Sequence, residues 1–96
     1  MATLADFMAV PTPSPAPTAV TVPGVADVHL AHPTFADLAV THDDQAMMVA
    51  HKIASTVVDP AGNRLFTDAA HALAVLNGKV PQILALLRAI KDLFGW

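Results

Sequence analysis

The sequence predicts a small α+β domain, mainly helical, in which a short N-terminal β-hairpin is followed by three to four helices, with a Pro-rich extended arm before it. Three observations predict this class. β-Branched residues alternate with polar ones over residues 19–30. Apolar residues recur at helical spacing in several segments after residue 34. A proline-rich run separates the first ten residues from the predicted strands and helices. We therefore expect a flexible N-terminal arm and linker over residues 1–18 and a small, mostly helical domain over residues 19–96.

The arm begins with a short apolar piece in which Leu4, Phe7 and Met8 lie at helical spacing. An isolated helix of that length is marginal in water. Two interpretations stay open, a frayed terminus and a docking peptide that folds on a partner. The next residues, PTPSPAP at 11–17, alternate proline with small residues and predict an extended, polyproline-like spacer.

The hairpin is predicted over residues 19–30. Val20 and Val22 alternate with threonines, Pro23-Gly24 indicates a turn, and two more apolar residues alternate with polar ones after it. A lone hairpin is marginal in water, so we expect this one to pack against the helices that follow.

Two helices are expected next. Thr34 is an N-cap candidate for a short helix in which Phe35 and Leu38 share one face. Asp43 or Asp44 caps a longer helix over residues 45–58. Its apolar positions at helical spacing are Met47, Ala50, His51, Ala54, Val57 and Val58, while Val49, Lys52 and Thr56 are expected to face outward.

The segment VVDPAGNRLFTD at residues 57–68 is the turn around which we expect the domain to be organised. Pro60 disfavours the α conformation at Asp59, so the preceding helix must stop there. Gly62 accepts a positive φ, which predicts a β-turn from Asp59 to Gly62. Leu65 and Phe66 are expected to return to the core. The structural turn residues are Asp59, Pro60, Gly62 and Phe66.

Two more helices are predicted to complete the chain. Residues 68–76 form one, with Asn77-Gly78 as its C-terminal signal. Pro81 suits the first turn of the last helix. The inward positions are expected to be Ala69, Ala72, Leu73 and Leu76 in the first, and Val80, Ile83, Leu84, Leu87, Ile90 and Phe94 in the second. Leu86 and Leu93 lie beside this second stripe and are expected to be accessible.

Composition excludes several classes of function. The net charge is −3 and the five Lys and Arg residues are scattered, which argues against nucleic-acid binding. The chain has no cysteine, so disulfides and thiol chemistry are excluded. The longest uncharged run, residues 7–26, contains five prolines and cannot be a membrane-spanning helix. No basic segment precedes it, so we expect a soluble, cytoplasmic protein without a signal peptide.

No residue pattern predicts an enzyme, a cofactor or a metal site. His29 and His32 point to opposite faces of an extended segment, and catalytic zinc needs three converging ligands. His51 and His71 have neither a serine-centred motif nor a glutamate to act with, because all eight acids are aspartates. Helix histidines that are partly buried are the simpler interpretation.

The order of motifs resembles that of the small tail assembly chaperones of long-tailed bacteriophages. In that family a short β segment leads into a T-(F/L)-A-(D/E)-L helix, a later helix ends in a V-x-D-x-x-G-x-x-L-F turn, and a leucine-rich helix finishes near a glycine. The matching residues are Thr34, Phe35, Ala36, Asp37 and Leu38, then Val58, Asp59, Gly62, Leu65, Phe66 and Asp68, and finally Leu84, Leu87, Ile90, Leu93 and Gly95. The chain departs from the family at His29, His32 and Asp37, where glutamates and arginines are frequent, which leaves the charge of a binding face open.

The resemblance implies a non-catalytic protein of the infected bacterial cytoplasm. Such chaperones bind the tape measure protein and keep it soluble until the tail tube polymerises around it. Tail tube subunits are a further implied partner, and self-association stays open. With an apolar helix as client, the candidate partner-binding residues are Leu86, Leu93 and Met48.

The alternative is a structural virion protein, such as a minor capsid, connector or tail component. Its Pro-rich arm would then thread between subunits. Recovery of the chain in mature virions would favour this alternative over the chaperone.

Overall fold

The computed structural model describes residues 1–9, 17–22, 24 and 26–96. Within them the chain forms helix α1 (Leu4–Met8), strands β1 (Thr18–Val22) and β2 (Ala26–Leu30), and helices α2 (Phe35–Ala39) and α3 (Gln45–Thr56). Strand β3 (Val57–Val58) and helices α4 (Ala69–Leu76) and α5 (Val80–Phe94) follow. The expected polyproline spacer falls almost entirely outside the described residues, as does Pro23 of the expected turn.

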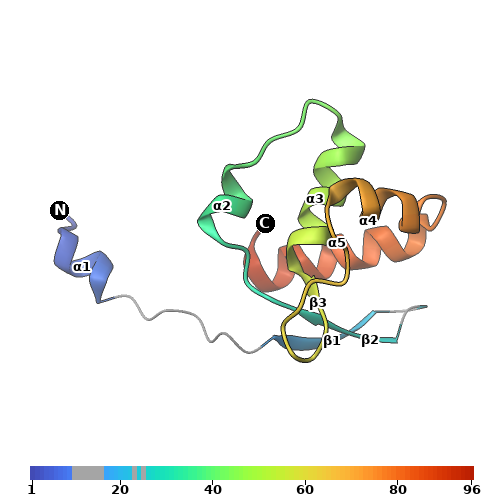
Figure 1. Cartoon of the computed structure of the whole chain (residues 1–96). Helices are drawn as coiled ribbons and strands as arrows, with labels where there is room; N and C mark the ends of the chain where they lie inside the picture. The colour runs from blue at the N-terminus through green and yellow to red at the C-terminus, as the bar shows by residue number, and fades with distance from the viewer. Residues whose placement is uncertain (10–16, 23, 25) are drawn as a thin grey trace.

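The predicted fold class is wrong in its topology. The hairpin does not begin the fold, because helix α1 precedes it, and the described residues form five helices and a third strand. α1 forms because Thr3 and Asp6 make a complete capping box. It stands apart from the body of the molecule, which the other elements form (Figure 1).

The sheet is antiparallel, in the order β1-β2-β3. β1 and β2 pair with Val20 opposite Val28, and β3 adds to β2 with Val57 opposite Leu30. The predicted helix over residues 45–58 is therefore too long by two residues. Val57 and Val58 are β-branched, and pairing with β2 satisfies their backbone groups in place of a further helical turn.

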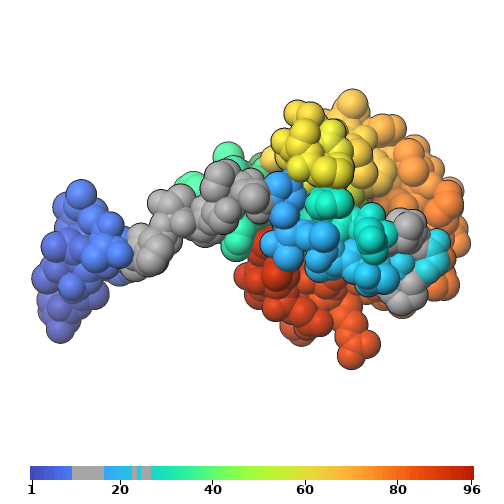
Figure 2. Space-filling view, turned by 90° about the horizontal axis from the view of Figure 1, so that it is seen from below, coloured from blue at the N-terminus to red at the C-terminus, as the bar shows by residue number. Residues whose placement is uncertain are grey.

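The core lies between the sheet and α3 and α5. β1 and β2 form the underside of the body, between the loop after β3 and α5 (Figure 2). α5 packs against both β1 and α3. The buried side chains of this core are Val22, Val28, Leu30, Ile53, Val57, Leu86 and Ile90.

A second, alanine-lined cluster joins α3 to α4. Ala50 and Ala54 of α3 meet Ala69 and Ala72 of α4, and small side chains let two helices approach closely. Phe66 is half-buried and packs against both clusters. Four of the chain's many alanines therefore form the close contact between α3 and α4.

Several predicted orientations are wrong. Thr56, expected to face outward, is fully buried, and its Oγ1 donates to the Lys52 carbonyl at 2.8 Å. Leu65, expected in the core, is exposed. In α5 the buried residues are Leu86 and Ile90, whereas Val80 and Leu84 are exposed. The apolar surface of α5 is wide enough that more than one face of the helix could have packed against the core. Packing on β1 and α3 buries the face that contains Leu86.

Candidate partner-binding surface

The turn after β3 is closed by its own polar groups. The Gly62 amide donates to the Asp59 carbonyl at 2.9 Å, and the Asp59 amide donates to the Asn63 carbonyl at 2.8 Å. Oδ1 of Asp59 accepts from the amides of Ala61 and Asn63, each at 2.9 Å. The hydrogen bond from the Asn63 amide, with further donors of the turn, holds the pKa of Asp59 below its usual value. Gly62 has φ +93°, which favours glycine.

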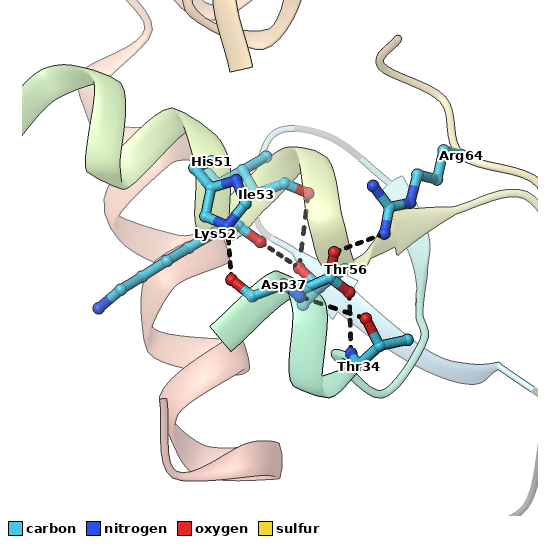
Figure 3. A network of polar contacts seen from close by, with 7 residues as sticks. All are labelled: Thr34, Asp37, His51, Lys52, Ile53, Thr56 and Arg64. Carbon is cyan, nitrogen blue, oxygen red and sulfur yellow. Dashed lines mark hydrogen bonds and ion pairs between the residues drawn. The ribbon is translucent and has the colours of Figure 1, made fainter. Parts of the chain in front are cut away.

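This turn positions Arg64, a residue that no sequence motif marked as functional. A bridge between Val58 and Arg64 returns the chain to the end of β3. From there Nη2 of Arg64 donates to Oδ1 of Asp37 at 2.8 Å, as Figure 3 shows. One sequence signal was present, because Arg64 is the only Lys or Arg between Lys52 and Lys79 and follows the predicted turn. Nothing local indicated that its partner would be 27 residues away.

Asp37 is the buried polar residue of α2. Its Oδ2 accepts from the Thr34 amide at 2.8 Å, and the Asp37 amide donates to Thr34 Oγ1 at 3.2 Å. Nε2 of His51 lies 2.7 Å from the Asp37 carbonyl oxygen and donates to it (Figure 3). Burial alone would raise the pKa of Asp37, but the hydrogen bonds from Thr34 and Arg64 together outweigh it and lower the pKa.

The structure separates the three predicted partner-binding residues. The expectation that Leu86 is accessible is wrong, since 3% of it is exposed and it belongs to the core. Leu93 is 38% exposed on α5, and Met48 is half-buried on α3. The three residues therefore do not form one exposed contact surface.

A different apolar surface was missed. A groove between α3, α4 and the start of α5 is lined mainly by apolar surface, and none of the described residues that line it has a charged side chain. Leu73 and Val80 at this groove are exposed. The groove could not be found from one helix alone, because its walls come from three. The larger side chains that line it are Val49, Ile53, Leu73, Leu76, Val80 and Ile83.

Exposed apolar side chains also occur on both short helices. Phe35 and Leu38 of α2, which the sequence analysis places on one face of a short helix, are both exposed. Leu4, Phe7 and Met8 of α1 are exposed as well. Both short helices therefore carry large apolar side chains that the fold leaves in contact with water.

Within the described residues no group of three or more His, Cys, Asp or Glu side chains lies close enough to hold a metal ion. None of the described helices has both the length and the apolar character needed to cross a bilayer. No protein-family model, no curated protein and no solved structure matches the chain.

Proposed function

We propose that this chain is a small assembly chaperone of a long-tailed bacteriophage, which binds the tape measure protein and keeps it soluble until the tail tube polymerises. It acts in the cytoplasm of the infected bacterium and needs no catalytic group or cofactor. The motif order across residues 20–95 supports the proposal through its resemblance to that family.

The observation that carries the proposal is the uncharged groove between α3, α4 and α5. A long helical client presents apolar side chains at i, i+3, i+4 and i+7, and a groove walled by helices accepts such a stripe. Val80 and Leu73 are already exposed at the groove, so a client side chain would remove apolar area from water there. Subunits of the tail tube can later displace the chain from its client.

Co-expression with the tape measure protein tests this function. We expect the client to be soluble and to co-purify only when the chain is present. Val80→Asp should abolish co-purification, because it would place an unpaired charge in the apolar interface. Leu84→Asp is the matched control, since Leu84 lies one turn along α5, is similarly exposed and does not line this groove.

Leu93→Asp and Met48→Asp test the two remaining sequence-predicted contacts in the same assay. If Leu93→Asp abolished binding and Val80→Asp did not, the client would bind at the C-terminal end of α5 and not at the groove. If the client were equally soluble without this chain, the proposed chaperone function would be refuted.

The second candidate is a structural virion protein. It is favoured by α1, which stands apart from the body with Leu4, Phe7 and Met8 exposed and could anchor between subunits. Quantitative mass spectrometry of purified particles separates the two functions. Stoichiometric recovery in finished particles supports the structural protein, whereas a chaperone is left behind on assembly.

A further inference from the structure

Helices α1 and α2 are two copies of one motif. Residues 3–7 read TLADF and residues 34–38 read TFADL, so both follow the pattern T-Φ-A-D-Φ, where Φ is Leu or Phe. Both fold into five-residue helices with the same complete capping box. Asp6 Oδ2 accepts from the Thr3 amide at 2.8 Å, as Asp37 Oδ2 does from the Thr34 amide at 2.8 Å.

α2 is held on the body chiefly through Asp37. We call the guanidinium of Arg64 and the imidazole of His51 the α2 seat. Arg64 binds Oδ1 of Asp37 at 2.8 Å, and His51 binds its carbonyl oxygen at 2.7 Å (Figure 3). Asp37 is buried, whereas Phe35 and Leu38 point their apolar side chains into solvent. The recognised feature is therefore the capped acidic turn, and either Leu or Phe fits the two exposed positions.

α1 carries every group that the α2 seat recognises. Its capping box uses Oδ2 of Asp6, and Oδ1 has no hydrogen bond within the described residues, which matches the oxygen that Arg64 binds in α2. None of the α1 residues is buried. We propose that the α2 seat is a binding site for T-Φ-A-D-Φ helices and that α1 of the same chain is its second ligand, in exchange with α2.

The arm is long enough for this exchange. Thr18, where the arm joins the body, pairs with Leu30, and α2 begins five residues after Leu30. The nine residues at positions 9–17 span up to about 30 Å when extended. Four residues, 31–34, connect α2 to the sheet. Loop-closure entropy therefore favours α2 over α1 by a factor of about three, before the second connection of α2 is considered. α1 would occupy the seat in at most about a quarter of molecules.

Energy transfer measures this occupancy in the full chain. The sequence has one tryptophan and no cysteine, and the Trp96 ring lies 5.9 Å from the ring of His51 in the seat. A Met8→Cys chain can carry a single dansyl acceptor on α1. Met8 corresponds to Ala39, which is exposed when α2 is bound. Asp37→Ala in this chain weakens α2, and transfer from Trp96 should rise at least about fourfold as α1 takes the seat.

The matched control is Asp37→Ala combined with Asp6→Ala. It keeps the same damage to α2 but removes the carboxylate from α1, so transfer should return to the starting level. Circular dichroism of both chains checks that the domain remains folded. Unchanged transfer in a folded Asp37→Ala chain would overturn the proposal, and so would a rise that persists without Asp6.

A peptide titration decides the matter if Asp37→Ala does not fold. The probe is the synthetic peptide MATLADFMA, added at millimolar concentration to the full chain carrying Asp6→Ala, whose own α1 cannot compete. We expect saturable NMR shifts at the Arg64 side-chain N–H and the His51 ring, and none with a peptide in which Asp6 is replaced by Ala. Absence of these shifts with the first peptide would refute the proposal that α1 is a second ligand of the α2 seat.

Discussion

Nη2 of Arg64 donates to Oδ1 of Asp37 at 2.8 Å, and this contact joins the turn after β3 to the capping box of α2. Asp37 thereby caps its own helix and also ties it to a segment 27 residues away. A residue that the sequence marks only as a first-turn acid becomes the attachment point of the helix. Because Asp37 is buried, the ionised carboxylate depends on these donors.

The first prediction concerns pH. The pKa of folded Asp37 lies below its unfolded value of about 3.8, so the ionised group stabilises the fold at higher pH. This contribution begins to fall when the pH drops below the unfolded pKa, at about 4. It is lost once the pH has fallen through the lower pKa of the folded state. Asp37→Asn should lower the urea midpoint at pH 7 and flatten its decline in acid. Asp43→Asn, at an exposed position, is the control, and identical pH profiles for Asp37→Asn and the parent chain would contradict the prediction.

The second prediction concerns the turn. Gly62→Val should destabilise the domain by about 1–2 kcal/mol because a β-branched residue is strained at positive φ. A Cβ at Gly62 would meet no atom within 4 Å, so steric collision contributes nothing. Gly62→Asn should cost less, since asparagine tolerates positive φ better. Thermal unfolding ranks the three chains, and equal losses for Val and Asn would exclude backbone strain as the cause.

The third prediction compares two leucines of α5. Leu86→Ala should cost about 2–5 kcal/mol because it opens a cavity in the main core. Leu84→Ala, two residues earlier on the exposed side, should stay within about 0.5 kcal/mol. Urea denaturation of the two single variants provides the measurement. The opposite ranking would place the sheet against the other face of α5.

The fourth prediction compares two adjacent hydroxyls at the end of α3. Ser55 Oγ is buried without a hydrogen-bond partner within the described residues, so Ser55→Ala should maintain or raise stability, by up to about 1 kcal/mol. Thr56 Oγ1 donates to the Lys52 carbonyl, so Thr56→Val should cost about 1 kcal/mol. The midpoint of chemical denaturation should therefore fall for Thr56→Val and stay the same or rise for Ser55→Ala. A loss with Ser55→Ala would indicate that its hydroxyl has a partner.

The sequence by itself determined the helix caps and the turn after residue 58. Thr34 was identified as a helix cap, and so was one of Asp43 and Asp44; in the structure the second cap is Asp44. Thr34 and Asp44 each accept an amide hydrogen bond from the first turn of their own helix. Gly62 was identified as a residue that accepts a positive φ in the turn after Pro60, and its φ is +93°. These features depend on backbone preferences and on contacts within four residues, which a sequence states directly.

Only the tertiary structure decided which apolar faces are buried and which polar groups meet. Val57 and Val58 continue a helical pattern, yet pairing with β2 made them a strand. α5 is apolar around much of its circumference, so its own sequence could not choose between Leu84 and Leu86, and packing on β1 and α3 chose Leu86. The contact between Arg64 and Asp37 likewise follows from the path of the whole chain, because neither residue's neighbours specify a partner 27 residues away.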